Sequence, residues 1–364
     1  MASQETLFIC VFAFLAARLT SMKCFVMIHT RASAEYTQLA LDSFFRNTEL
    51  LEGDSFILID NDQSLDNGVI FSHPDIRKIT NKCPCSFAEN ANRAMEIAAS
   101  GRSDLFLLNN DIIFTRNWLE PLCGDLPVII SAASNQNFQY GFEGFEIKPS
   151  MDIGDYRGYE LALEKIVDAH HLKKHGYRQM ISIPFFCVRI PFDVYTELGP
   201  FDLSFGIGGA EDTDYCLRTY IKGFGAFIAL DSYVLHFQGK STWRGPETVE
   251  DTKACNKQCL KAFEEKWGRA LTRLAILNDG TAISGNSRVA DRFREGLPYG
   301  IQELLIESEK FEQLGAWRPS VAAVYCVCDD TRWLRSSVES TYQSCDKIFF
   351  LVGNNTWNSN GGST

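Results

Sequence analysis

Two short apolar runs in this sequence each stop abruptly at a cluster of acids and amides. Residues 105–108 are followed by Asn109, Asn110 and Asp111, and residues 56–59 are followed by Asp60-Asn61-Asp62. A short apolar run with a polar boundary is typical of a strand buried on both faces of a parallel sheet. Ligands of such sheets bind at the carboxyl ends of the strands. Carboxylate and amide oxygens placed there can hold a hard divalent cation, which in turn holds phosphate.

Taken alone, the cluster at 109–111 has a simpler interpretation as a polar transition from strand to loop. For a single cluster this interpretation is favoured over a metal site. Two clusters at the ends of two strands are not what a random polar loop predicts. The elements that must position the clusters therefore decide between the two interpretations.

Strands and helices alternate along the chain. We predict strands at 24–29, 56–59, 76–80, 105–108, 128–131, 181–190 and 224–229. We predict helices at 36–45, 87–99, 159–172, 193–198 and 255–266, and a further helix that follows the glycine-rich segment 205–210 and ends at Gly223. This order predicts an α/β fold with a mostly parallel, Rossmann-like central sheet, right-handed crossovers and helices on both faces.

Changes in this pattern suggest four segments. Residues 1–21 form an extension whose apolar part, 7–17, is too short to span a bilayer and is a signal, an anchor or disordered. The main domain is expected at 22–285 and a helical linker, with a helix at 301–314, at 286–320. Residues 321–364 contain a strand-helix-strand order like that of 24–59, so we expect a partial second copy of the fold and a polar tail.

Charge and cysteine content limit the function classes. The 364 residues carry a net charge of -11, which argues against broad electrostatic binding of nucleic acid or anionic membranes. The 12 cysteines are scattered without the paired spacing of a zinc site. We therefore expect reduced thiols and a cytoplasmic protein, with peripheral association at the membrane face allowed and secretory targeting by 7–17 less favoured.

The order of the motifs resembles the family 2 inverting glycosyltransferases, which have the GT-A fold, and most of all their rhamnosyltransferase-type branch. The resemblance covers about residues 24–270. Residues 59–61 resemble the strand-end acidic motif that reads the nucleotide base and ribose. Phe87-Ala-x-x-x-Asn92 resembles a helix motif of the family, with Ser86 where glycine is usual, and Asn109-Asn-Asp111 resembles the metal-binding DxD motif, with Asn at its first position.

Three later motifs continue the resemblance in the same order. Residues 198–202 resemble the acceptor-side Gly-x-Phe-Asp segment, and Glu211-Asp212-x-Asp214-x-x-x-Arg218 resembles the catalytic Glu-Asp element. His236 resembles the histidine that completes the metal or diphosphate site. Each match alone is weak, because acids in the first turn of a helix commonly cap it and a lone histidine is commonly a core residue. Six matches in order are specific.

The resemblance implies inverting transfer of a sugar from a UDP-, dTDP- or GDP-linked donor to a hydroxyl of a glycan or lipid-linked acceptor. It implies a divalent cation, Mn²⁺ or Mg²⁺, at Asp111 and His236, where the charge of a leaving diphosphate would develop. Asp212 is the expected general base, with Glu211 beside it. The nucleotide-sugar ligands would be Thr30, Arg31, Asp60, Asn61, Asn92, Asn109 and Asn110, and the acceptor ligands Asp202 and Asp214.

Two other functions fit parts of the sequence. A nucleotidyltransferase shares the sheet and a metal site at a strand end, but it leaves residues 211–218 and His236 without a role. A sugar-nucleotide or glycan-binding module with decayed catalysis would explain Asn109 and the incomplete second copy. Release of nucleoside diphosphate, release of pyrophosphate, or binding without turnover separates the three functions.

Overall fold

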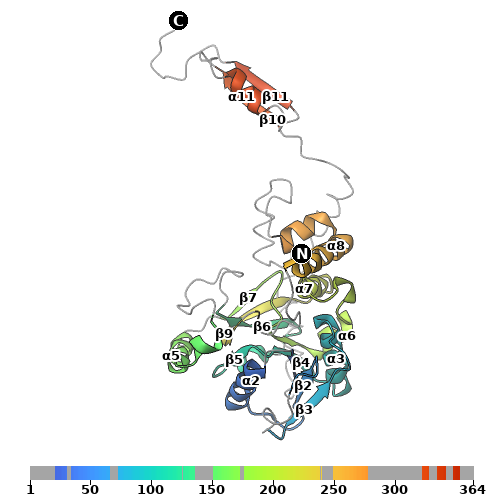
Figure 1. The fold of residues 1–364 in the computed structure, drawn as a ribbon, viewed down its shortest axis with the longest axis vertical. Coiled ribbons are helices and arrows are strands. Elements are labelled where there is room, and N and C mark those ends of the chain that lie inside the picture. The colour runs from blue at the N-terminus through green and yellow to red at the C-terminus, as the bar shows by residue number, and fades with distance from the viewer. Residues whose placement is uncertain are drawn as a thin grey trace, which may run out of the picture. The chain divides into compact units, whose positions relative to one another are not determined.

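The computed structural model describes residues 21–30, 34–65, 73–124, 126–135, 151–172, 176–237, 239, 249–277, 322–327, 334–341 and 347–352. The chain divides into two compact units, Met1–Ser308 and Glu309–Thr364. The larger unit is built on a nine-stranded sheet and the smaller on a two-stranded sheet (Figure 1). Among the described helices, none combines the length and apolar character needed to cross a membrane.

The first four strands form the parallel half of the large sheet, in the order β3-β2-β1-β4. Their bounds are β1 Lys23–His29, β2 Ser55–Asp60, β3 Ile76–Thr80 and β4 Asp104–Asn109. The sheet continues through β8 (Cys187–Ile190), β6 (Ile129–Ser134), β9 (Ala226–His236) and β5 (Ile112–Phe114), and β7 (Tyr177–Gln179) also pairs with β9. β6 and β9 run in the direction of β1 to β4, whereas β5, β7 and β8 run against it. The predicted α/β class with a mostly parallel sheet is confirmed.

The other elements are helical. They are α2 Ala34–Asn47, α3 Phe87–Ser100, α4 Ile153–Tyr156, α5 Glu160–His171, α6 Phe192–Leu198, α7 Glu211–Ile221 and α8 Val249–Leu271, with short turns at Glu120–Leu122, Leu203–Phe205 and Thr272–Ile276. The helical geometry of α8 is interrupted at Gly268. The smaller unit contains β10 (Ala322–Val327), α11 (Leu334–Thr341) and β11 (Lys347–Val352), and its two strands pair in parallel.

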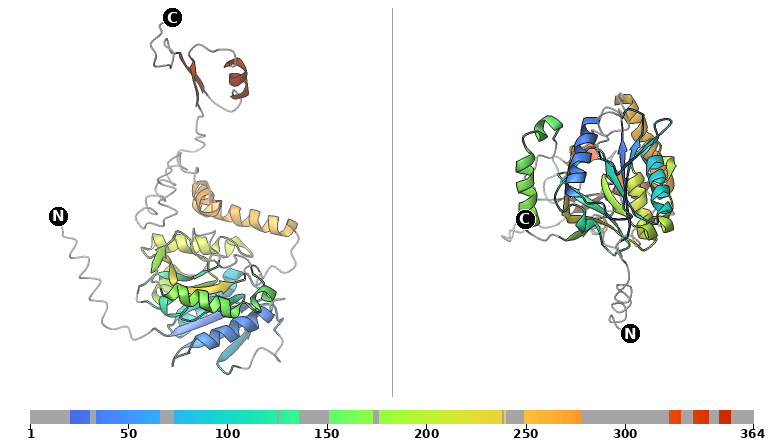
Figure 2. Two further views of the ribbon diagram at one scale, coloured as in Figure 1. Left: turned by 90° about the vertical axis from the view of Figure 1, so that its left-hand side faces the viewer. Right: turned by 90° about the horizontal axis from the view of Figure 1, so that it is seen from below.

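Each central strand sends alternate side chains into two separate cores. In β1, Cys24 and Val26 belong to one core, while Phe25 and Met27 belong to the other. The first core lies against α3, α6 and α7, and the second against α2, on the opposite side of the sheet (Figure 2). Because both faces are buried, these strands are continuously apolar, and this is why they were recognisable in the sequence.

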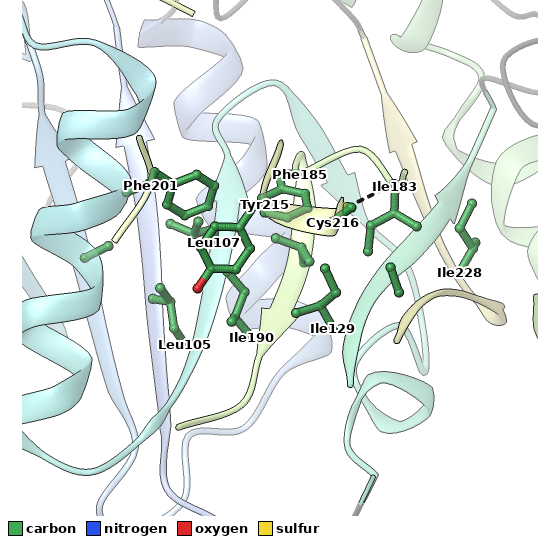
Figure 3. Packing of buried hydrophobic residues seen from close by; sticks show 14 of the residues in the cluster. Leu105, Leu107, Ile129, Ile183, Phe185, Ile190, Phe201, Tyr215, Cys216 and Ile228 are labelled. Carbon is green, nitrogen blue, oxygen red and sulfur yellow. Dashed lines mark hydrogen bonds between the residues drawn. The ribbon is translucent and has the colours of Figure 1, made fainter. Parts of the chain in front are cut away.

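Aromatic packing fixes α7 over the sheet. Leu105 and Leu107 of β4 lie in the same cluster as Tyr215 of α7 (Figure 3). The Tyr215 ring stacks on Phe201 with the ring centroids 4.2 Å apart. The start of α7 is therefore held directly above the strand that ends at Asn109.

The ends of two elements have clear local causes. Ser86, at the position where the resembled family has glycine, caps α3: its hydroxyl accepts a hydrogen bond from the Glu89 amide, and the Glu89 carboxylate accepts one from the Ser86 amide. The strand predicted at 181–190 is restricted to β8, because Pro184 has no amide proton to donate to a sheet. The buried apolar residues of the predicted strand that precede β8 belong to the core but not to the sheet.

Several predictions lie beyond these segments. The extension at 1–21, apart from Ser21, and the linker at 286–320 with its helix at 301–314 lie outside the described residues. The predicted domain boundaries and the idea of a second copy of the fold stay predictions.

Candidate functional site

The carboxyl ends of three neighbouring strands bring the predicted residues to one edge of the sheet. His29, the last residue of β1, pairs with Asp60 of β2, and Ile28 pairs with Asn109 of β4. β5 runs antiparallel to β9 and places Ile112 opposite His236. This pairing brings Asp111 to His236, and the Asp111 Oδ1 atom lies 3.4 Å from His236 Nε2.

The surroundings of His236 suit a metal ligand. Its ring stacks on Phe186 with the centroids 4.7 Å apart, and its backbone amide donates to Asn135 Oδ1. Its Nδ1 atom is buried and has no hydrogen-bond partner within the described part of the chain. The ring nitrogen that faces the Asp111 carboxylate is Nε2, and a buried carboxylate beside an imidazole nitrogen is a donor set that fits Mn²⁺.

Asp60 presents one oxygen without a partner at the same edge. Its side chain is 1% exposed, and its Oδ2 atom lies 3.1 Å from the Lys78 ammonium. Its Oδ1 atom is buried and has no hydrogen-bond partner among the residues that the structure describes. A buried carboxylate oxygen of this kind is suited to accept a hydrogen bond from a ligand hydroxyl or N–H group.

Asn61 and Asn92 are engaged within the protein. The Asn61 carbonyl oxygen accepts from Asn81, Asn90 and the Cys85 amide, and its amide donates to the Cys85 carbonyl. Asn92 makes two hydrogen bonds to the backbone of Phe201. Both residues position loops beside the site, and their predicted contact with the nucleotide sugar stays a prediction.

The remaining predicted nucleotide-sugar ligands lie at the ends of β1 and β4. Thr30 is buried, and Arg31 lies outside the described residues. Asn109 is half-buried, and its backbone amide donates to Phe186. Asn110 is fully buried, and its amide donates to Thr37 Oγ1 at 2.7 Å.

A strained glycine-rich loop leads into α7. Gly206, Gly208 and Gly209 have φ angles of 75°, 151° and 121°, and Ala210 adopts the left-handed conformation at 68°. A side chain on Gly209 would also meet Cys259 of α8, with the added Cβ 3.2 Å from the sulfur. Non-glycine residues rarely adopt the left-handed region, and such strain is concentrated at functional sites.

The first residues of α7 carry the predicted base. Glu211 is buried and accepts a hydrogen bond from the Gly209 amide. Asp212 accepts one from the Thr213 amide at 2.7 Å. Burial raises the pKa of the Asp212 carboxyl above its ordinary value, although its hydrogen bonds act in the opposite direction. A carboxylate with a raised pKa is a stronger base, as proton abstraction requires.

Asp214 and Asp202, the predicted acceptor ligands, are both bound to Lys266 of α8. The Lys266 ammonium lies 2.7 Å from Asp214 Oδ1 and 2.6 Å from Asp202 Oδ2. Asp214 is fully buried and also accepts from Trp267 and Arg218. Burial alone would raise the pKa of Asp202, but hydrogen bonds from Lys266 and the Ser204 amide lower it to about 2. Both carboxylates are therefore engaged with the protein, and their contact with an acceptor stays a prediction.

A second group near β1 can also hold a divalent metal ion. His29, Asp60 and Asp62 present ligand atoms that all lie within 4.8 Å of one another. Together with Asp111 and His236, the structure therefore supplies suitable groups for the divalent cation that the sequence predicts.

No protein-family model matches this chain, and no curated protein matches it. Its fold is similar to that of GalNAc-T7 in complex with UDP, GalNAc and Mn²⁺, with 13% identity and a TM-score of 0.47 over 90% of this chain and 58% of that one. It is also similar to the mannosyltransferase PcManGT from Pyrobaculum calidifontis in complex with GDP-Man and Mn²⁺, with 11% identity and a TM-score of 0.43 over 86% and 95%. This chain thus spans less than two thirds of the length of the GalNAc-T7 structure.

Sequence reasoning missed four residues that shape the site. His29 had a visible signal, since it ends the first apolar strand one residue before Thr30. Lys78, which pairs with Asp60, lies on a half-buried strand and reads as an ordinary surface residue. Lys266 and Trp267 are far from the motifs in sequence, and nothing local indicates that they reach Asp214.

Proposed function

We propose that this chain is an inverting, metal-assisted glycosyltransferase that transfers a sugar from a nucleoside diphosphate to a hydroxyl of a glycan or lipid-linked acceptor. The observation that carries the proposal is the contact between Asp111 and His236, which are distant in sequence and face each other 3.4 Å apart. His236 ends β9 and Asp60 ends β2, at the carboxyl ends of strands that run in the same direction in one sheet. We place the chain in family 2, nearest its rhamnosyltransferase-type branch, on the motifs in its sequence.

Asp212 would act as the general base. A carboxylate oxygen of Asp212 takes the proton of the acceptor hydroxyl, while the hydroxyl oxygen forms a bond to the anomeric carbon of the donor. The bond between that carbon and the diphosphate oxygen breaks, and the nucleoside diphosphate leaves with the electron pair. A single displacement of this kind inverts the configuration at the anomeric carbon. The raised pKa of Asp212 supports this role.

Asp111 and His236 would hold the divalent cation. Two protein ligands leave coordination positions for diphosphate oxygens, and the histidine favours Mn²⁺ over Mg²⁺. When bound, the cation supplies electrostatic stabilisation of the negative charge on the leaving diphosphate.

The donor and acceptor would lie on either side of this metal pair. The free Oδ1 atom of Asp60 suits a ribose hydroxyl or a base N–H group of a UDP-, dTDP- or GDP-linked sugar. Leu203 and Ile207, 53% and 48% exposed in the segment before α7, support an acceptor that carries an apolar part. The eight cysteines described in the larger unit are all free, which supports a cytoplasmic location.

A panel of UDP-, dTDP- and GDP-sugars with Mn²⁺ tests the proposal through the released products. We expect release of nucleoside diphosphate by the wild-type protein and loss of release in Asp111→Asn and His236→Asn. Asp168→Asn is the matched control, because that carboxylate is 52% exposed on α5, and its rate should equal that of the wild type.

Other products would contradict the proposal in distinct ways. Release of pyrophosphate would indicate nucleotidyl transfer. Binding of a nucleotide sugar without release of any product would indicate a binding module with decayed catalysis.

A further inference from the structure

His29 lies at the centre of the candidate site, although no motif of the sequence assigns it a role. It is the last residue of β1, and it is fully buried between β2 and β4. On one side is Asp60 of the nucleoside end, and on the other are Asn109 and Asn110, which precede Asp111. The contacts that hold the His29 imidazole in place therefore connect the nucleoside end of the site, at Asp60, with the metal end, at Asp111.

Both ring nitrogens of His29 make hydrogen bonds to hydroxyl groups. Nδ1 lies 2.7 Å from Thr37 Oγ1, and Nε2 lies 3.0 Å from Ser64 Oγ. The Thr37 oxygen also accepts a hydrogen bond from the Asn110 amide at 2.7 Å. The Ser64 hydroxyl donates to the Asp62 carboxylate at 2.6 Å. These contacts form a continuous chain of hydrogen bonds from Asn110 to Asp62.

The directions of these bonds follow from what each group can donate. The Asp62 carboxylate can only accept, so the single hydroxyl proton of Ser64 is committed to it. Ser64 must then accept from His29, which places a proton on Nε2. Nδ1 faces the Thr37 hydroxyl, which already accepts from the Asn110 amide, and that amide itself lies 3.5 Å from Nδ1. Nδ1 is therefore the acceptor, and a ring with its proton on Nε2 alone is neutral. The chain is thus directed from Asn110 through Thr37, His29 and Ser64 to Asp62.

The same contacts argue against His29 as a metal ligand, although its cluster with Asp60 and Asp62 can hold an ion. Ligation through Nε2 would remove its proton and break the bond to Ser64. The Lys78 ammonium already lies 3.1 Å from Asp60 and would repel a second cation. The geometry therefore favours a hydrogen-bonded ring over a coordinated one.

We propose that His29 is a positioning residue whose neutral, Nε2-protonated imidazole joins the metal-side residue Asn110 to the nucleoside-side residue Asp62. The role of His29 in nucleotide binding rests on the proposed function. The assignment of its proton to Nε2 does not depend on that function. The ring fixes the spacing between the two ends of the site, so that a nucleoside and its diphosphate meet groups already in place. Site variants should therefore weaken nucleotide binding while metal binding is retained.

The tautomer is measured directly by long-range proton–nitrogen NMR of the free protein with ¹⁵N-labelled histidine. The chain has six histidines, and the signal lost in His29→Gln assigns His29. We expect the neutral Nε2–H pattern at neutral pH, unchanged when Mg²⁺ is added. An Nδ1–H pattern, a charged ring, or a change of tautomer on adding Mg²⁺ would overturn the inference. This measurement needs no bound nucleotide, so it gives an answer even if the proposed function fails.

Calorimetric titration with UDP and GDP tests the positioning role. Ser64→Ala and Thr37→Val each remove the two bonds that one hydroxyl makes in the chain. Each should weaken nucleotide binding about five- to tenfold, with unchanged affinity for Mn²⁺ alone. Ser100→Ala and Thr196→Val are the controls, because these hydroxyls bond only within or beside their own helices in the described structure. Unchanged nucleotide affinity in Ser64→Ala and Thr37→Val, or loss of Mn²⁺ binding in them, would overturn the role. Failure of the wild type to bind either nucleotide would contradict the proposed function instead.

Discussion

The two halves of the candidate site are held by different forces. The nucleoside half, at the ends of β1 and β2, is fixed chiefly by neutral hydrogen bonds through Asn61 and His29, with one ion pair between Lys78 and Asp60. The acceptor half, at the start of α7, is fixed by charges, since Lys266 of α8 joins Asp202 to Asp214. Added salt should therefore weaken the contacts of Lys266 but not the hydrogen bonds of Asn61.

The difference separates two carboxylates that look alike in the sequence. Asp212 and Asp214 both lie in the first turn of α7, and both belong to the same motif. Asp214 is surrounded by Lys266, Arg218 and Trp267, whereas the hydrogen bonds of Asp212 within the described structure are made to Thr213. A carboxylate already paired with two cations is a poor base, and one without a cation is available to take a proton.

The largest effect on stability is expected for Asp214→Ala. Removal of a fully buried anion leaves Arg218 and Lys266 close together without it, and the free energy of unfolding should fall by about 3 kcal/mol. Urea denaturation measures this loss. Asp168→Ala, at an exposed position, should change stability by less than about 0.5 kcal/mol. A loss of equal size in the two variants would show that the contacts of Asp214 with Lys266 and Arg218 do not stabilise the fold.

A smaller loss is expected for Asn61→Ala in the neutral half. This change leaves Asn81, Asn90 and the Cys85 amide without their shared acceptor, and we expect a loss of about 2 kcal/mol in the same assay. Added salt should leave the loss unchanged, because no charge is involved. A strong salt dependence would contradict the contrast between the two halves.

Lys266→Met should show its effect through pH. In the folded protein the pKa of Asp202 is about 2, below its ordinary 3.8, so its pairing stabilises the fold above 3.8 and is lost as pH falls towards 2. We expect a stability loss of about 1 kcal/mol at neutral pH that shrinks as pH falls through this range. Lys266→Arg should restore most of the loss. Denaturation curves at a series of pH values measure the difference in stability between Lys266→Met and the wild type. A difference that does not depend on pH would contradict a stabilising contact between Lys266 and Asp202.

The smallest effect is expected from His29. Burial lowers the pKa of this residue in the fold, so the unfolded chain binds a proton more readily. Its contribution to stability is therefore present above the ordinary value of 6.5 and is lost as pH falls below it. The groups that face it are Asp60 and Asp62, which raise its pKa, and Lys78, which lowers it. His29→Gln should flatten the pH dependence of the melting temperature just below 6.5, and an unchanged curve would contradict a neutral buried ring.

The parts of this fold that the sequence revealed are those with local causes. Strands buried on both faces are continuously apolar, so β1, β2 and β4 and the polar clusters behind them were predicted within one residue or so. β5 and β7 have three residues each, too few for a pattern, and both were missed. The strand predicted at 224–229 extends further in the structure, where β9 runs from Ala226 to His236 with an irregularity in its pairing to β6.

The parts of the site that the sequence did not reveal depend on contacts between distant segments. The pairing of Asp111 with His236 was expected from the order of motifs, and the structure places them together. Lys266 binds both Asp202 and Asp214, although these residues belong to separate segments and no motif in the sequence indicates that they meet. The use of Asn61 as the centre of a loop network likewise depends on Asn81 and Asn90, which are distant in the chain. Side-chain partners of this kind follow from the fold and not from spacing.

Nucleoside diphosphate release by Asp212→Asn tests the central claim most directly. The variant keeps the acceptor for the Thr213 amide, so it should unfold no more readily than the wild type. With the best donor of the panel and saturating Mn²⁺, release should fall by about 10²- to 10⁴-fold, because the acceptor hydroxyl has lost its base. A folded Asp212→Asn protein that releases nucleoside diphosphate at the wild-type rate would contradict the account.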